Sequence, residues 1–206
     1  MTRLSAGHAD ERQYDRAAIL LAGGAGTRFR GTGHKLLATV NAPTTATVIE
    51  HALTHAREAD IGPVIVVTGA LPEPIAPELI GDDVIICQNE LWAQGQITSV
   101  QAGIEIARAL GCTRVVIGLG DQPFVSPDAW RRVANDPSPI AVATYNGQRG
   151  NPVALADETW QLLPTTGDEG ARSLIRARPD LVSEVSCPGS PADIDTTEDL
   201  HRWQNN

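Results

Sequence analysis

Short apolar runs alternate with helix-length segments along most of the chain, and this alternation is the strongest constraint on the fold. The runs are almost continuous in Val, Ile, Leu and Ala, which is typical of strands buried on both faces of a sheet. Alternating strands and helices favour an α/β fold with a mostly parallel sheet. Strands are expected at Ala17–Leu21, Val64–Thr68, Val84–Cys87, Val115–Gly118 and Ile140–Ala143, with a loop at Gly147–Asn151 before a short strand at Pro152–Leu155.

Helix signals lie between these runs. Thr47 and Glu50 have the spacing of a capping box, and Ser126 before Pro127 places an N-cap residue ahead of a proline at the first helical position. Prolines divide the second half of the chain into shorter elements. Helices are expected at Thr47–Ala59, Ile97–Leu110, Pro127–Val133, Asp157–Leu163, Gly170–Arg176 and Thr197–Gln204.

Composition excludes several classes of protein. The formal net charge of the 206 residues is −9, and a surface this acidic repels nucleic acid. No apolar run approaches the roughly 18 residues that a membrane helix needs. Cys87, Cys112 and Cys187 are far apart and form no C-x-x-C pair, so neither a disulfide framework nor a structural zinc site is expected. We expect a flexible extension over residues 1–16, one domain over residues 17–206 and a cytoplasmic location, without nucleic-acid or membrane partners.

The first expected strand leads into the most glycine-rich stretch of the chain, Gly23–Gly33. Glycines let backbone N–H groups approach a phosphate, and Arg28, Arg30 and Lys35 add cationic donors. Lys35 is the only lysine in the sequence. The stretch matches neither the Walker motif nor the dinucleotide fingerprint, because the required lysine and third glycine are missing from their positions. Its glycines and cations favour a phosphate site over the alternative, a flexible surface loop.

Six segments of the chain form an ordered set. Each is a weak signal alone, but the order is specific. They are Leu21-Ala22-Gly23-Gly24-x-Gly26-x-Arg28 with Lys35-Leu36-Leu37; Asn89-x-x-Trp92-x-x-Gly95-x-x-x-Ser99; Gly120-Asp121-Gln122-Pro123; Arg149-Gly150-Asn151-Pro152-Val153; Gly167-Asp168-x-Gly170-Ala171-Arg172; and Asp193-Ile194-Asp195-Thr196-x-Glu198-Asp199-Leu200.

Together these segments resemble the MobA-like NTP transferases, and the branch they resemble most is the molybdenum cofactor cytidylyltransferases. The resemblance implies a three-layer α/β/α fold of the nucleotide-diphospho-sugar transferase type, which is Rossmann-like. It also implies an Mg²⁺-dependent nucleotidyltransferase that moves CMP from CTP to a phosphorylated acceptor, a molybdopterin-type molybdenum cofactor, and releases pyrophosphate. Two positions depart from this branch: Gly24 stands where it usually has alanine, and Asn151 where it often has histidine.

Asp121 is the strongest candidate for a metal ligand. It follows an apolar strand at its carboxyl end, where open α/β sheets bind ligands, and a carboxylate is a suitable hard ligand for Mg²⁺. The alternative is an aspartate that only forms a turn. The resemblance implies Asp195 as the second ligand, with Asp193 as the fallback. It further implies that Arg28 and Lys35 hold the triphosphate and act in catalysis together with Asp121.

The resemblance also assigns the contacts to the two substrates. The acceptor is expected to meet Arg149, Asn151 and Arg172, although surface ion pairs are the alternative for the two arginines. The nucleotide is expected to meet Leu21, Ala22, Gly23, Gly24, Gly26, Asn89, Gly95 and Ser99.

Three other functions are left open by the sequence. The same reaction on a sugar phosphate or polyol phosphate would need the same residues. A non-catalytic protein that binds molybdenum cofactor and delivers it to an apoenzyme would not need Lys35, Asp121 and Asp195 together. An oxidoreductase, a label carried by some relatives of the family, is disfavoured by the missing dinucleotide fingerprint. The expected partners are an NTP, a phosphorylated small molecule, and a molybdoenzyme or its chaperone.

Overall fold

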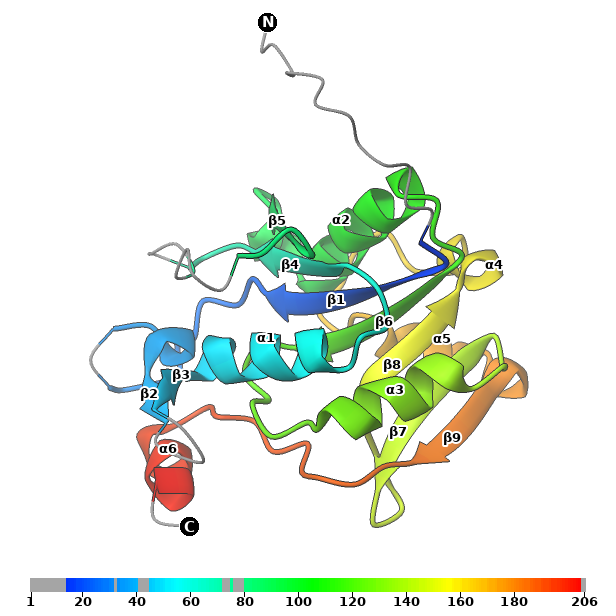
Figure 1. Ribbon diagram of the computed structural model, residues 1–206. Helices are drawn as coiled ribbons and strands as arrows, with labels where there is room; N and C mark the ends of the chain where they lie inside the picture. Colours follow the sequence, from blue (N-terminus) through cyan, green and yellow to red (C-terminus); the bar gives the residue numbers. More distant parts are fainter. Residues whose placement is uncertain (1–13, 32, 41–44, 72–74, 76–79, 205–206) are drawn as a thin grey trace, which may run out of the picture.

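A seven-stranded sheet lies at the centre of the molecule (Figure 1). The computed structural model describes residues 14–31, 33–40, 45–71, 75 and 80–204. The spatial order of the strands is β5-β4-β1-β6-β8-β7-β9, and β8 alone runs antiparallel to its neighbours. The strands are β1 (Arg16–Ala22), β4 (Val64–Thr68), β5 (Val84–Gln88), β6 (Arg114–Leu119), β7 (Ile140–Tyr145), β8 (Gln148–Ala156) and β9 (Val182–Ser186), and β2 (Thr39–Val40) pairs with β3 (Ala46–Thr47) in a separate ribbon.

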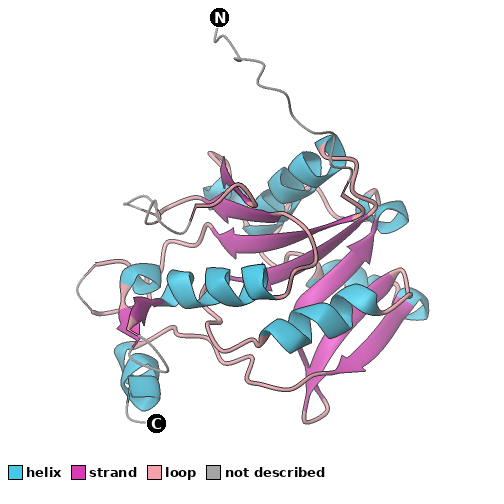
Figure 2. Cartoon of the chain, in the orientation of Figure 1, coloured by secondary structure: helices cyan, strands magenta, loops and turns pink. Residues whose placement is uncertain are grey.

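Helices cover both faces of the sheet (Figures 1 and 2). Ala18 and Leu20 of β1 share a core with α1 and α3, whereas Ala17 and Ile19 share a second core with α2, α4 and α5. Successive residues of β1 thus alternate between two buried faces, which is why its sequence is apolar throughout. The predicted three-layer α/β/α fold with a mostly parallel sheet is confirmed. The helices are α1 (Val48–Glu58), α2 (Gln96–Ala109), α3 (Pro127–Asn135), α4 (Asp157–Trp160), α5 (Arg172–Ala177) and α6 (Thr197–Gln204).

The helix starts follow their local signals. The Thr47 N–H donates to Glu50 Oε2 at 2.6 Å, and the Glu50 N–H donates to Thr47 Oγ1 at 3.4 Å, so the predicted capping box is present. Ser126 Oγ accepts from the Ala129 N–H at 3.3 Å and caps α3. Every predicted helix is present, although α4 ends three residues earlier than expected.

One sequence-based expectation about the strands was wrong, and three strands, β2, β3 and β9, were not predicted. The expected loop at Gly147–Asn151 lies mostly within β8, because Asn146 (φ 51°) and Gly147 (φ 79°) turn the chain so tightly that pairing with β7 resumes at Gln148. An Asn-Gly pair is a strong hairpin signal, so the sequence did carry this information. β9 was not predicted, because its alternating polar side chains give it no apolar run.

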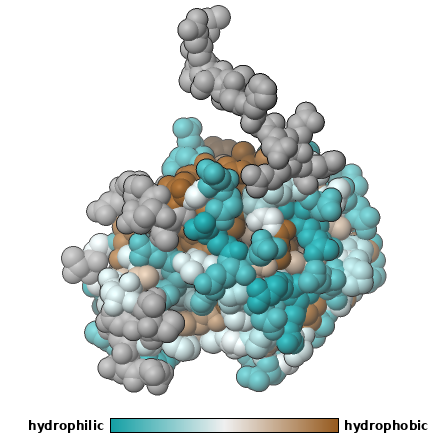
Figure 3. Space-filling model, in the orientation of Figure 1, coloured by the Kyte–Doolittle hydropathy of each residue, from teal (hydrophilic) through white to brown (hydrophobic). Residues whose placement is uncertain are grey.

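The surface agrees with this layering. Figure 3 shows mainly hydrophilic residues across the face that carries α1 and α3, with hydrophobic residues visible between them. No helix within the described ranges is long and apolar enough to cross a membrane.

Most of the extension predicted for residues 1–16 lies outside the described residues, which begin at residue 14.

Candidate active site

Asp121 and Asp195 meet at the carboxyl edge of the sheet. Asp121 follows β6, whose end is held to β1 by the Gly120 N–H, which donates to the Leu21 carbonyl at 2.8 Å. A second backbone hydrogen bond joins the two acidic segments: the Ile194 N–H donates to the Asp121 carbonyl at 2.9 Å. The Ile194 side chain is fully buried and anchors this joint in the core. The backbone therefore places the two carboxylates side by side.

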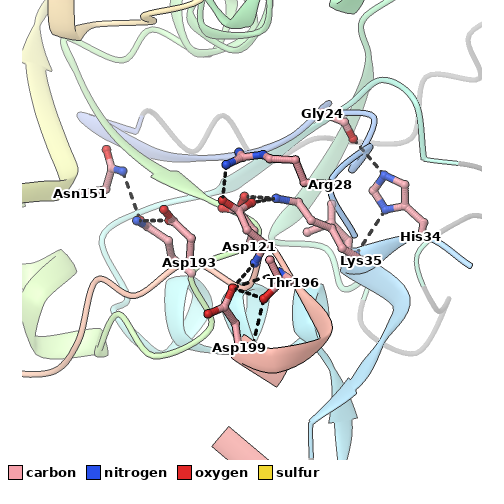
Figure 4. A network of polar contacts seen from close by, with 12 residues as sticks. Gly24, Arg28, His34, Lys35, Asp121, Asn151, Asp193, Thr196 and Asp199 are labelled. Carbon is pink, nitrogen blue, oxygen red and sulfur yellow. Dashed lines mark hydrogen bonds and ion pairs between the residues drawn. The ribbon is translucent and has the colours of Figure 1, made fainter. Parts of the chain in front are cut away.

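The start of α6 fixes the backbone at Asp195 (Figure 4). Asp199 Oδ2 accepts from the Thr196 N–H at 3.0 Å and from the Asp195 N–H at 3.3 Å. In return, Thr196 Oγ1 accepts from the Asp199 N–H at 3.1 Å. The hydrogen bond from the Thr196 hydroxyl is the largest of the effects that lower the pKa of Asp199. Thr196 and Asp199 thus cap the start of α6 reciprocally, and Asp199 also holds the backbone of Asp195 in place.

Lys35 lies between the carboxylates of Asp121 and Asp195 (Figure 4). It stands in a one-turn 3-10 helix, η1 (Lys35–Leu37), and its side chain is only 10% exposed. Its Nζ is 2.6 Å from Asp121 Oδ2 and 2.7 Å from Asp195 Oδ1. Burial acts to lower the pKa of Lys35, but the charges and hydrogen bonds of the two carboxylates outweigh it, and the pKa is raised. The ammonium therefore keeps its charge at neutral pH.

Arg28 adds a second cation at the open side of the cluster. Its Nη1 is 3.0 Å from Asp195 Oδ2, and its side chain is 77% exposed. An ion pair this exposed contributes little to stability. Little energy therefore opposes a turn of the guanidinium toward a more strongly charged ligand.

Asp193 is the third carboxylate of the cluster, and a chain of amides holds it. Gln122 Nε2 donates to Asp193 Oδ1 at 2.7 Å and to the Pro191 carbonyl at 2.8 Å. Asn151 Nδ2 in turn donates to Gln122 Oε1 at 3.1 Å. Burial, followed by the charge of Asp121, raises the pKa of Asp193. The three aspartates thus concentrate negative charge around two cations.

The glycine-rich stretch forms a wall of the cleft above this cluster. The cleft has a volume of about 710 Å³, which is within the range of small-molecule sites. Gly26 has a φ of 61°, and a Cβ there would lie 3.2 Å from Lys35 Cγ. The Gly26 backbone and the aliphatic part of the Lys35 side chain are therefore closely packed. Among the predicted nucleotide contacts, those that line the cleft are Leu21, Ala22, Gly23, Gly24, Gly26, Gly95 and Ser99.

Asn89 lies behind the cleft wall instead of in it. This buried side chain donates from Nδ2 to Ser99 Oγ at 3.0 Å and to Thr98 Oγ1 at 2.9 Å. Its Oδ1 accepts from the Leu91 N–H at 2.9 Å. Asn89 thus holds Ser99 in place at the start of α2, and Ser99 faces the cleft.

The predicted acceptor contacts have different positions. Arg172, the first residue of α5, lines the cleft. Asn151 lines a small neighbouring hollow together with Arg172 and points its amide at Gln122. Arg149 does not line the cleft, and its Nε is 2.7 Å from Glu184 Oε1 in β9. Contact of these three residues with an acceptor stays a prediction.

The donor set fits a hard divalent cation that shares its coordination with a substrate. Asp121 and Asp195 present oxygen atoms to one position, which the Lys35 ammonium now contacts. The described residues hold no group of three or more His, Cys, Asp or Glu side chains placed to bind a metal by themselves. Mg²⁺ is usually bound by one or two carboxylates together with substrate phosphates, so two aspartates suffice for such a site.

Among the residues at or beside the cleft that were not assigned a role from sequence, three side chains stand out. His34 is 9% exposed and contacts both the glycine-rich stretch and η1. Trp92 and Asp168 both line the cleft. His34 carries no motif of its own, whereas Trp92 and Asp168 stand inside the recognised segments and were the more accessible from sequence.

Comparison with known proteins identifies a family model and a relative that match most of the chain. The model of the MobA-like NTP transferase domain matches residues 18–182. The chain is 28% identical over 197 residues to the nicotine blue oxidoreductase of Paenarthrobacter nicotinovorans, an alignment covering 89% of this chain and 94% of that protein.

Two solved structures extend the comparison. A nucleotidyl transferase from Methanothermobacter thermautotrophicus has a TM-score of 0.77 and 25% identity over 92% of this chain and 96% of its own. The complex of Rv0371c from Mycobacterium tuberculosis H37Rv with manganese has a TM-score of 0.70 and 25% identity over 93% of this chain and 99% of that one.

Proposed function

The chain belongs to the MobA-like NTP transferase family and is a nucleotidyltransferase, and we propose that it transfers CMP from CTP to the phosphate of a molybdopterin-type molybdenum cofactor. The observation that carries this proposal is the convergence of Lys35, Asp121 and Asp195 in the cleft lined by the glycine-rich stretch. A non-catalytic carrier would not need the buried Lys35 ammonium paired with two carboxylates beside a glycine-rich backbone segment.

The chemistry requires no general base. A phosphate oxygen of the acceptor attacks the α-phosphorus of the nucleotide and forms a new P–O bond. The bond from the α-phosphorus to the oxygen that bridges to the β-phosphorus breaks, and pyrophosphate leaves with that electron pair. Because the second pKa of a phosphate is about 6, the nucleophile is already anionic near neutrality.

The residues of this chain contribute position and charge. Lys35 and Arg28 hold the triphosphate, and Lys35 stabilises negative charge near the α-phosphate. The backbone N–H groups of Gly23, Gly24 and Gly26 provide further donors. Aligning the two substrates and neutralising their mutual repulsion supply the rate enhancement.

A divalent ion, for which we propose Mg²⁺, would be held by Asp121 and Asp195. When bound, it would neutralise phosphate charge and polarise the phosphoryl group. The manganese complex of the Mycobacterium tuberculosis protein supports a divalent ion at this fold. Asp193, hydrogen-bonded to Gln122, supports the two ligands from the side as a source of negative charge.

The choice of CTP and of the acceptor rests on the likeness of the recognised segments to the cytidylyl-transferring branch. We assign the base to the region of Ala22, Gly95 and Ser99, with Asn89 holding Ser99. We assign the acceptor phosphate to the side of the cleft that Arg172 lines.

Thermal-shift measurements with CTP, GTP, ATP and UTP, each with Mg²⁺ or Mn²⁺, test the choice of base. CTP is expected to give the largest stabilisation. A larger shift with GTP would reject the cytidylyl assignment but keep the reaction, and no shift with any nucleotide would reject the proposal in favour of an accessory binder. Pyrophosphate release with molybdenum cofactor, a sugar phosphate or a polyol phosphate then tests the acceptor, and release with either of the last two alone would reject the molybdopterin assignment.

A further inference from the structure

His34 connects the glycine-rich stretch to η1. Its Nε2 is 2.9 Å from the Gly24 carbonyl oxygen, and its Nδ1 is 3.3 Å from the Leu36 backbone nitrogen (Figure 4). The residue is 9% exposed, so water competes weakly for these bonds. A Cβ at Gly26 would lie 3.4 Å from His34 Nε2. The imidazole ring therefore packs within the loop and is not a side chain on its outer surface.

The two contacts fix which ring nitrogen carries the proton. A backbone N–H only donates, so Nδ1 must accept from Leu36 through its lone pair. A carbonyl oxygen only accepts, so Nε2 must carry the proton that it donates to Gly24. In this arrangement Nδ1 of His34 accepts a hydrogen bond and Nε2 donates one.

This contact also sets the direction of the next backbone N–H. The peptide between Gly24 and Ala25 is trans, since the only cis peptide among the described residues is Asn151–Pro152. In a trans peptide the C=O and the N–H point in opposite directions. Because His34 holds the Gly24 oxygen, the Ala25 N–H points away from the ring. Gly24 and Ala25 both line the cleft.

We propose that His34 is a positioning residue that aims the Ala25 N–H at the triphosphate and joins that donor rigidly to the turn carrying Lys35. The inference rests on the proposed function, because it needs a polyphosphate in the cleft. Without this contact the Gly24–Ala25 peptide is able to rotate, as glycine permits, and its oxygen would then repel a phosphate. His34 would act through the backbone and would not touch the reacting atoms.

Two substitutions separate this role from general packing. His34→Leu places an apolar side chain of similar size there and removes the hydrogen-bond donor. His34→Gln retains an amide N–H able to reach the Gly24 carbonyl. His51→Leu is the matched control, since His51 is another buried histidine near a backbone carbonyl, with Nε2 3.4 Å from the Val40 oxygen and outside the residues that line the cleft.

Binding of inorganic tripolyphosphate with Mg²⁺, measured by titration calorimetry, is the first readout, because this probe depends on neither base nor acceptor. His34→Leu is expected to weaken binding about tenfold, the effect of one misplaced hydrogen-bond donor, with His34→Gln and His51→Leu within about threefold of wild type. Hydrogen exchange of the Gly23–Thr27 amides without ligand is the second readout, and it is expected to accelerate in His34→Leu only.

Wild-type binding by His34→Leu would overturn the inference, as would equally weak binding by His34→Gln. Unchanged exchange of the Gly23–Thr27 amides in His34→Leu would also overturn it. Failure of the wild-type protein to bind tripolyphosphate would instead overturn the proposed function, and this inference with it. The two failures are therefore distinguishable in one set of titrations.

Discussion

The Nζ atom of Lys35 is within 2.7 Å of a carboxylate oxygen of both Asp121 and Asp195, so the only lysine of the chain pairs with both residues proposed to bind metal. A divalent ion that used these oxygens would meet the ammonium there. A triphosphate entering with the ion would offer Lys35 a new partner. This arrangement favours binding of the metal and the nucleotide together over binding of the metal alone.

Substitution of Lys35 by Met should therefore have opposite effects on metal binding and on catalysis. Without nucleotide, the affinity for Mn²⁺, measured by electron paramagnetic resonance, should rise about tenfold because a competing cation is gone. Nucleotidyl transfer should fall by about 10²–10³-fold because charge near the α-phosphate is no longer stabilised. A lower affinity for Mn²⁺ in Lys35→Met would contradict the competition.

Arg172 and Arg149 form a matched pair for the acceptor site. Arg172 lines the cleft, whereas Arg149 pairs with Glu184 outside it. We expect Arg172→Ala to raise the KM for the acceptor about tenfold and Arg149→Ala to change it less than about threefold, since a charged hydrogen bond to phosphate is worth more than an exposed ion pair. Steady-state kinetics at saturating nucleotide measure both, and a larger effect at Arg149 would place the acceptor near β8.

Gly118 in β6 leaves room for Trp130, which is almost fully buried. A Cβ at Gly118 would lie 2.4 Å from Trp130 Cζ2. Gly118→Ala should therefore lower the free energy of unfolding by about 1–3 kcal/mol through overpacking. Gly24→Ala is the control, because a Cβ there would meet nothing within 4 Å. Urea unfolding of both variants measures the difference. Equal free energies of unfolding would show that the Trp130 side chain moves aside without loss of stability.

His55 should make stability depend on pH. Burial lowers its pKa below 6.5, although the charge of Glu58 opposes this. The unfolded chain then takes up the proton first, so stability from this residue is complete above the unfolded pKa and is lost as the pH falls below it toward the folded pKa. His55→Gln should lose less stability than wild type between about pH 7.5 and about pH 5.5 in chemical unfolding. An identical loss of stability in both proteins would show that His55 does not contribute to the pH dependence.

The central sheet was predictable because burial on both faces leaves a continuous apolar run, as in Val64–Thr68 and Ile140–Ala143. β9 was not predictable, because its own sequence has no apolar run. Its strand conformation comes from pairing with β7 at the edge of the sheet. Capping signals located α1 and α3, since they act between residues three positions apart.

The site was predictable in its residue types but not in its supports. Lys35, Asp121 and Asp195 stood out from composition, strand position and family likeness, but their ion pairs join segments far apart in sequence. Gln122 links Asn151 to Asp193, and His34 reaches the Gly24 carbonyl, through contacts that neither residue's local sequence indicates. Such supports become visible only when the chain is folded.

Pyrophosphate release from CTP with Mg²⁺ and molybdenum cofactor, compared between wild type and Asp121→Asn, is the decisive measurement for the proposed transfer site. The substitution keeps the shape of the side chain but removes the charge that contacts Lys35. Wild type is expected to release pyrophosphate at least about 100-fold faster than Asp121→Asn at equal folded content. Equal rates in the two proteins would contradict a metal-bearing carboxylate at residue 121 and the transfer site built around it.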